Sequence, residues 1–142
     1  MLRLRDELGL DNVVMLEQQP KHLMPSLWAL SCVSLIVLRK AELFKTVIPS
    51  KLFESMAMEK PVILGVEGES AEIVRSAQAG FSIEPENAQE LAASLLKLYR
   101  NADLCATLGA NGRRHVIEHF DRSVLAKQFQ VVLHAACDSV AA

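Results

Sequence analysis

The sequence predicts an α/β fold of the Rossmann-like type, in which helices cover both faces of a parallel sheet. Short apolar runs that read as strands alternate along the chain with stretches of helical periodicity. The runs are apolar throughout, as expected for strands that are buried on both faces. With 142 residues, of which 51% are hydrophobic and 23% charged, the chain suits one domain with a substantial core.

Charge and cysteine content narrow the class of protein. A net charge of −2 argues against a nucleic-acid-binding surface. Cys32, Cys105 and Cys137 are far apart and fit neither a disulfide framework nor a metal motif, so we expect buried, reduced thiols in a cytoplasmic protein. No apolar run approaches the ~20 residues of a membrane span, and the charged N-terminus is not a secretory signal.

The first part of the chain is expected to hold two helices and two strands. Leucines at helical spacing among charged residues predict a helix over Leu2–Leu8, which Gly9 would end. The apolar run Asn12–Leu16 predicts a short buried strand. Helical spacing of leucines predicts a second helix over Lys21–Leu30, and a β-branched run predicts a strand over Val33–Leu38.

A loop over Arg39–Ile48 then leads to the central stretch of the chain, TVIPSKLFESMAMEKP (46–61). Pro49 and Ser50 mark a helix start, and the helix carries Leu52, Phe53, Met56 and Ala57 on one side. The apolar run Pro61–Leu64 follows as a buried strand. The unit therefore reads as loop, helix and strand.

The remainder continues the alternation of helices and strands. Asn87 and Glu90 have the spacing of a capping box in its Asn form. The glycines Gly109 and Gly112 indicate an interruption or close packing of the helix that holds them. The expected elements are a helix over Glu69–Ala77, a strand over Gly80–Ile83, a helix from Asn87 to Tyr99, a helix from about Leu104 to His119, and a last helix that starts at Asp121 or Ser123.

The start of the central helix is the candidate binding site. Ligands of open parallel sheets lie at the carboxyl ends of the strands, and the free N–H groups of a helix start bind anions there. Ser50 and Glu54 are four residues apart and share one helix face, which suits a diphosphate at the tip and a sugar beside the carboxylate. A structural alternative is that Ser50 caps the helix and Lys51 pairs with Glu54 on the surface.

The stretch PSKLFESMAMEKPVILGVEGESAEIV (49–74) resembles the donor-binding segment of retaining, nucleotide-sugar-dependent glycosyltransferases of the GT-B type, group 1 or family 4. Bacterial polysaccharide enzymes are the most similar. The flanking stretches NVVMLEQQP (12–20), SLIVLRKAELFKTVIPSK (34–51), AGFSIEPENAQE (79–90) and LGANGRRHVIEHF (108–120) resemble the same domain. The resemblance implies that residues 1–142 form a partial nucleotide-sugar-binding C-terminal domain, with at least one preceding βα unit and the N-terminal acceptor domain absent.

The resemblance also implies roles for single residues. Glu54 would bind the ribose hydroxyls, and Thr46 would stand near the donor sugar, where the family has a glutamate. Ser50 and Lys51 would reach the diphosphate, with Pro49 in place of a usual glycine. Gln18 and Arg39, on the flanking loops, complete the expected donor-binding set. Glu59 also replaces a usual glycine, at a cost on the order of 1 kcal/mol if its backbone is left-handed.

The implied reaction moves a glycosyl group from a nucleoside diphosphate to a saccharide or lipid-linked acceptor in cell-surface polysaccharide synthesis. It needs no metal or other cofactor, and the chain is expected to be inactive without the acceptor domain. Peripheral association with the inner face of the plasma membrane, with Arg113 and Arg114 exposed, remains an alternative to a purely cytoplasmic location. His115 and His119 have the spacing of a metal pair but lack a Glu-x-x-His pattern, so ordinary histidines are expected.

Other functions remain open from the residues alone. A nucleotide-binding module without catalysis would retain the same site, and one half of a sugar epimerase would share the architecture. A phosphate-regulated receiver module would need clustered aspartates at the strand ends, and Glu17, Arg39, Gly65 and Glu84 stand there instead. The final helix is apolar enough along one side to need a partner.

Overall fold

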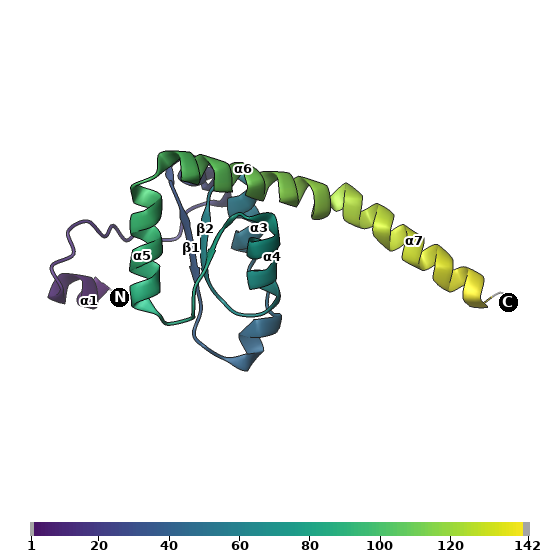
Figure 1. The fold of residues 1–142 in the computed structure, drawn as a ribbon, viewed down its shortest axis with the longest axis horizontal. Coiled ribbons are helices and arrows are strands. Elements are labelled where there is room, and N and C mark those ends of the chain that lie inside the picture. Colours follow the sequence, from purple (N-terminus) through teal and green to yellow (C-terminus); the bar gives the residue numbers. More distant parts are fainter. Residues whose placement is uncertain (1, 141–142) are drawn as a thin grey trace.

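The computed structural model describes residues 2–140, and side chains from Leu2 to Cys137. Three strands alternate with helices along the chain (Figure 1). The elements are α1 (Leu2–Glu7), η1 (Lys21–Leu23), α2 (Met24–Leu30), β1 (Ser34–Val37), η2 (Glu42–Thr46), α3 (Ser50–Ala57), β2 (Val62–Gly65), α4 (Glu69–Ala77), β3 (Gly80–Ser82), α5 (Ala88–Tyr99), α6 (Ala102–His119) and α7 (Arg122–Val140).

The three strands form one parallel sheet in the order β1-β2-β3. Val62 pairs with Ser34 on one side and with Gly80 on the other, so β2 is the central strand. Parallel neighbours require crossover helices, and α3 and α4 serve as these connections. The expected Rossmann-like α/β fold is therefore confirmed.

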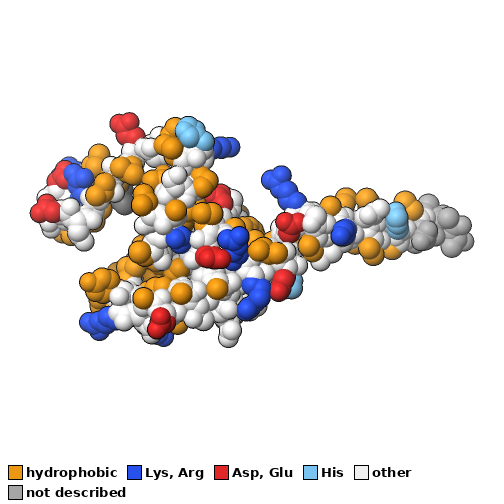
Figure 2. Space-filling model, turned by 90° about the horizontal axis from the view of Figure 1, so that it is seen from above, with side chains coloured by type: hydrophobic (Ala, Val, Ile, Leu, Met, Phe, Trp, Pro, Cys, Tyr) orange, Lys and Arg blue, Asp and Glu red, His pale blue; other side chains and the backbone are white. Residues whose placement is uncertain are grey.

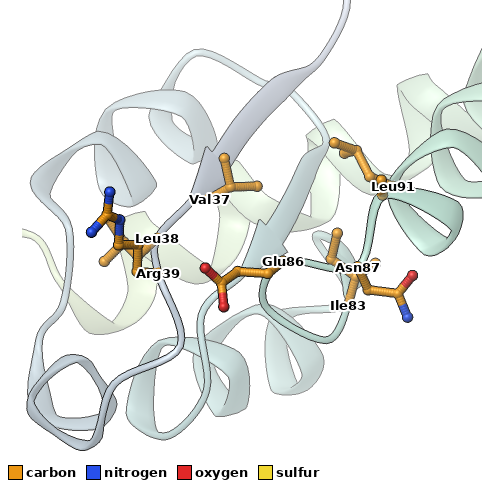
Figure 3. A pocket seen from close by; sticks show the side chains of 8 residues that line it. Val37, Leu38, Arg39, Ile83, Glu86, Asn87 and Leu91 are labelled. Atoms are coloured by element: carbon orange, nitrogen blue, oxygen red, sulfur yellow. The ribbon is translucent and has the colours of Figure 1, made fainter.

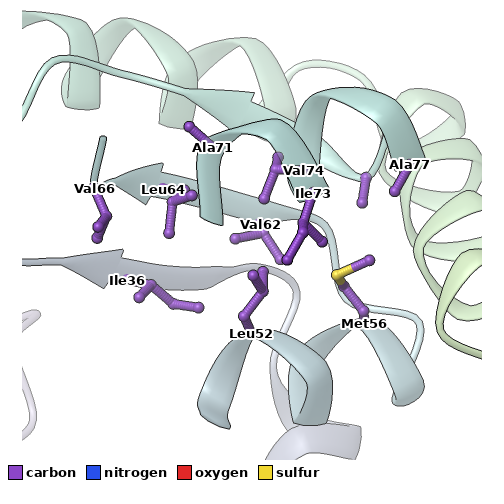
Figure 4. Packing of buried hydrophobic residues seen from close by; sticks show 11 residues of the cluster. Ile36, Leu52, Met56, Val62, Leu64, Val66, Ala71, Ile73, Val74 and Ala77 are labelled. Atoms are coloured by element: carbon purple, nitrogen blue, oxygen red, sulfur yellow. The ribbon is translucent and has the colours of Figure 1, made fainter. Parts of the chain in front are cut away.

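The core lies on both faces of the sheet. Alternate residues of β2 point to opposite sides: Val62 and Leu64 face α3 and α4, whereas Ile63 faces α5 and α6. Figure 4 shows Leu52 and Met56 of α3 below the sheet residues, with α4 packed on the same cluster. The three residues of β2 and the two of α3 are all fully buried. This packing fixes α3 across the sheet and sets the direction of its N-terminus.

Local sequence patterns predicted most helices and strands correctly. The Asn87 side chain accepts a hydrogen bond from the Glu90 N–H at 3.0 Å, as the capping motif predicts. In a full capping box the Glu90 carboxylate would accept from the Asn87 N–H. It accepts instead from the Glu84 N–H at 2.9 Å, and so links the two ends of the turn that precedes α5. The close packing expected at Gly109 is confirmed, because a Cβ there would lie 2.2 Å from the Glu59 carbonyl oxygen.

The predicted strand over Asn12–Leu16 is wrong. These residues have no strand structure, and Val14 and Leu16 are 77% and 64% exposed. An apolar run becomes a strand only when a neighbouring strand takes up its backbone groups. Within the described chain, β1 pairs with β2 alone, and no strand lies beside this run. The predicted loop over 39–48 also contains the short helix η2.

The cysteines are free, but the prediction that they are buried is wrong for two of them. Cys32 and Cys137 are exposed, and Cys105 is half-buried. Burial raises the pKa of the Cys105 thiol, and the nearby Cys32 adds to the effect. In the described part of the chain, no helix has the length and apolarity that a membrane crossing requires.

Candidate functional site

The N-terminus of α3 is open to solvent. Pro49 occupies the N-cap position with extended backbone, and no side chain caps the helix. Ser50 is the first helical residue and is exposed, so the alternative that Ser50 caps α3 is wrong. No backbone hydrogen bond uses the N–H groups of Ser50 and Lys51 among the described residues. Two donors and the positive end of the helix dipole therefore face outward.

Glu54 lies one turn further along α3. Its side chain is exposed, as are those of Ser50 and Lys51. The surface pair between Lys51 and Glu54 that we considered does not occur among the ion pairs of the described residues. The carboxylate thus remains available beside the helix tip.

The segment that enters α3 is held in place by the first turn of α4. Ser70 is fully buried, and its hydroxyl donates to the Val47 carbonyl at 2.8 Å. Gly68, with φ 81°, packs so closely that a Cβ would lie 2.1 Å from the Lys45 carbonyl oxygen. Sequence reasoning missed this clamp, because Gly68 read only as a loop residue. The clamp preorganises the approach to the helix tip.

Thr46 ends η2, just before this clamped segment. It is exposed, and its hydroxyl donates to the Leu43 carbonyl at 3.2 Å. The neighbouring Lys45 ammonium lies 2.7 Å from Glu42 and 3.6 Å from Glu67. The hydrogen bond with Glu42 is the main cause that raises the pKa of Lys45. Thr46 therefore carries a hydroxyl, but no charge of its own, and that hydroxyl bonds within η2.

An ion pair joins the loops after β1 and β3. The Lys40 Nζ lies 2.7 Å from a Glu84 carboxylate oxygen. This hydrogen bond raises the pKa of Lys40 and lowers the pKa of Glu84. Sequence analysis placed Glu84 at a strand end but could not show that it touches Lys40.

A cavity of about 340 Å³ opens at the same edge of the sheet (Figure 3). Val37 and Arg39 contribute from the end of β1, and Asn87 and Leu91 from the start of α5. Figure 3 shows the Glu86 carboxylate extending toward Leu38 and Arg39. No residue of α3 lines this cavity, so it lies apart from the open helix tip. The sequence analysis did not predict it.

The expected site residues thus divide into two groups. Thr46, Pro49, Ser50, Lys51 and Glu54 lie together on η2 and α3. The other two lie elsewhere: Arg39 lines the neighbouring cavity, and Gln18 is exposed in an irregular segment.

Metal-ligating residues do not gather in the described part of the chain, where no group of three or more His, Cys, Asp or Glu side chains is placed to hold an ion. The rings of His115 and His119 have centroids 4.5 Å apart. The two rings therefore contact each other, and no further side chain of the described residues joins them to form a metal site.

Family membership follows from comparison with known proteins. The family model of the glycosyl transferases group 1 matches residues 1–115. The chain belongs to this family. The resemblance noted from the sequence is confirmed at the level of family and fold, and no curated protein sequence matches the chain.

Solved structures with the same fold come from several bacteria. The chain is similar to sucrose-phosphate synthase from Thermosynechococcus elongatus, with 21% identity and a TM-score of 0.80 over 97% of this chain and 34% of that one. It is similar to a glycosyltransferase from Rickettsia africae, with 24% identity and a TM-score of 0.76 over 91% and 34%. It also matches the C-terminal domain of a group 1 glycosyl transferase from Francisella tularensis, with 21% identity and a TM-score of 0.69 over 85% and 60%.

Proposed function

We propose that this chain is the donor-binding domain of a glycosyltransferase that takes its sugar from a nucleoside diphosphate sugar. The observation that carries the proposal is the uncapped N-terminus of α3, with Glu54 exposed one turn away and a clamped segment leading into the helix. Membership of the glycosyl transferases group 1 supports it.

The chemistry follows from charge. When the glycosyl bond breaks, negative charge develops on the leaving diphosphate. The free N–H groups of Ser50 and Lys51, the helix dipole and the Lys51 ammonium would stabilise that charge without rearrangement. The Glu54 carboxylate can accept two hydrogen bonds from the ribose diol. These groups would stabilise the negative charge that a metal ion would otherwise stabilise, and we therefore propose a reaction without a metal ion.

The acceptor is proposed to be a saccharide or lipid-linked hydroxyl in cell-surface polysaccharide synthesis. The chain spans 34% of the sucrose-phosphate synthase chain that it matches. We therefore propose that the acceptor binds another domain, and that hexosyl transfer requires that domain. We further propose a cytoplasmic location, with peripheral contact to the inner face of the plasma membrane as a variant of it.

A binding module without catalysis is the second candidate. Thr46 stands where the resemblance implies a glutamate, and its hydroxyl is engaged by the Leu43 carbonyl. In this case the nucleotide would bind while transfer would not occur. Both candidates require the same nucleotide site, so binding is the first property to measure.

Calorimetry with UDP and GDP tests the site. We expect Glu54→Ala to weaken binding of the preferred nucleotide by about 1–3 kcal/mol, the scale of a lost hydrogen bond to a charged group. Glu118→Ala, an exposed carboxylate on α6, serves as the control and should bind as the wild type does. Equal affinities of wild type and Glu54→Ala would remove Glu54 from the site, and absence of binding to either nucleotide would refute the donor-site proposal.

A further inference from the structure

Two cysteines that are far apart in the sequence, Cys32 and Cys105, lie near each other in the structure. Both line a cavity of about 470 Å³, whose walls also include Pro61 and Ala102. Both also line a cavity of about 340 Å³ beside α5. The charge of Cys32 contributes to the raised pKa of the Cys105 thiol, so the two sulfurs lie within electrostatic reach of each other.

Cys32 lies in a bend between α2 and β1. The residues on either side of this bend are held by hydrogen bonds. The Ser31 hydroxyl donates to the Leu27 carbonyl of α2 at 2.8 Å, and the Ser34 N–H donates to the Pro61 carbonyl at 2.9 Å. Cys32 is therefore kept at the amino end of β1, away from the carboxyl ends of the strands.

Cys105 lies near the start of α6, which is fixed by its cap. The Asn101 side chain accepts a hydrogen bond from the Leu104 N–H at 2.9 Å. The Cys105 thiol donates to the Leu98 carbonyl at 3.3 Å, and the same carbonyl accepts from the Asn101 N–H at 3.1 Å. The thiol can therefore turn away from this carbonyl without leaving it unpaired.

We propose that Cys32 and Cys105 form a reversible disulfide in the folded protein. The bond requires the two Cβ atoms to lie roughly 3.5–4.5 Å apart. The cavity that both residues line leaves room for their side chains to turn toward each other without displacing a packed side chain. The bend at Cys32 is outside any helix or strand, so it is the part of the chain that adjusts, whereas α6 keeps its place.

The oxidant is a low-molecular-weight disulfide such as oxidised glutathione. The exposed Cys32 reacts first: its thiolate attacks one sulfur of the small disulfide, forms a mixed disulfide and releases the other sulfur as a thiolate. The Cys105 thiol, which burial keeps protonated, then gives its proton to solvent and attacks the Cys32 sulfur, which releases the second small thiol. Two protein thiols are oxidised to one disulfide while one small disulfide is reduced to two thiols.

Peptide mapping of the full chain tests the proposal, in a Cys137→Ser background that removes the third, exposed thiol. The native protein is treated with oxidised glutathione, its remaining thiols are blocked with a maleimide, and it is digested with trypsin. We expect the peptides 22–39 and 101–113 to be joined, with both thiols protected from the maleimide until dithiothreitol restores them. Cys32→Ser and Cys105→Ser in the same background are the controls, and neither should give the joined peptides.

Urea unfolding shows whether the bond fits the native fold. A disulfide between these residues closes a long loop and constrains the unfolded chain, so the oxidised protein should unfold at a higher urea concentration than the reduced protein. An unchanged or lower midpoint would overturn the proposal. A stable mixed disulfide at Cys32 with Cys105 still free would also overturn it, as would a link that forms only in urea or only between two chains.

Discussion

At the scale of single residues, Glu59 adopts an unfavourable backbone conformation because the end of α3 requires it. Its backbone has φ 55°, in the left-handed region that favours glycine. The Glu59 N–H bonds to the Met56 carbonyl at 3.0 Å, and the Lys60 N–H bonds to the Ser55 carbonyl at 2.9 Å. These two bonds form the Schellman motif that ends α3 and turns the chain into β2.

Replacement of Glu59 by glycine is therefore expected to stabilise the protein. Relief of the left-handed backbone exceeds the greater freedom of glycine in the unfolded chain, for a net gain of about 0.5–1 kcal/mol. The exposed pair with Arg113, at 3.5 Å, contributes little. Urea unfolding measures the difference, with Glu59→Ala as the control that loses the pair but keeps the strain. A Glu59→Gly variant less stable than Glu59→Ala would contradict this account.

His115 is the residue most suited to a pH test. Burial lowers the pKa of its ring, and repulsion by His119 lowers it further, against an opposing effect of Glu118. Its ring centroid lies 5.8 Å from that of Phe120, at the junction of α6 and α7. The folded protein therefore favours the neutral ring.

Because the folded pKa lies below the ordinary value of about 6.5, the unfolded chain takes up the proton first as the pH falls. We expect the free energy of unfolding to decrease as the pH is lowered through about 6.5, and His115→Phe to flatten this dependence. Urea titrations across that range provide the measurement. His134→Phe, on the exposed face of α7, is the control that should keep the wild-type slope.

At the scale of elements, two glycines allow α6 to approach α3. Gly109 packs against the backbone of Glu59, whereas the nearest atoms to a Cβ at Gly112 are side-chain atoms of Ala79 and Met56 at 3.2–3.4 Å. The first contact cannot adjust without a backbone shift. The second can adjust by a small movement of Met56, which is flexible.

Gly109→Ala is therefore expected to destabilise the protein by at least about 1 kcal/mol, the scale of an overpacked core. Gly112→Ala should change the free energy of unfolding by less than about 1 kcal/mol, because the gain in helix propensity offsets the crowding. Denaturant unfolding of both variants provides the comparison. Equal effects would mean that backbone contact at Gly109 does not limit the approach of the helices.

Elements with strong local signals were predicted well. The Glu69–Ala77 helix has the bounds that the sequence indicated, and the Asn87 cap forms as expected. The contacts that join distant segments near the carboxyl ends of the strands were not predicted. Ser70 lies 23 residues from Val47 in the sequence, and Lys40 lies 44 from Glu84. No local pattern identifies such partners, because the fold alone brings them together.

At the scale of the whole molecule, α7 extends away from the body (Figure 1), and exposed hydrophobic side chains line this arm in the space-filling view (Figure 2). Phe129 and Val132 are 63% and 62% exposed. The sequence analysis expects this apolar helix to need a partner, and the described part of the structure leaves its apolar side chains exposed. The stability of the described body therefore resides in the sheet and in α3 to α6.

Substitutions on α7 and substitutions in the core should differ sharply in their effect on the free energy of unfolding. The double change Phe129→Gln and Val132→Gln should alter the free energy of unfolding by less than about 0.5 kcal/mol, as for exposed positions. Met56→Ala, at a fully buried site in the core, should cost about 2–5 kcal/mol. Circular dichroism during urea unfolding compares the two. A large loss in the double variant would show that α7 packs on the body in solution.

The sequence by itself determined the class of fold, the helix that holds the candidate site and the family resemblance. These properties depend on periodicity, turn residues and short contiguous motifs, which neighbours in the chain specify. Only the tertiary structure decided that the α3 tip stays uncapped, that α4 clamps its approach, and that residues 12–16 form no strand. The physical reason is that backbone and side-chain hydrogen bonds require partners, and the packing of distant segments determines which partners are within reach.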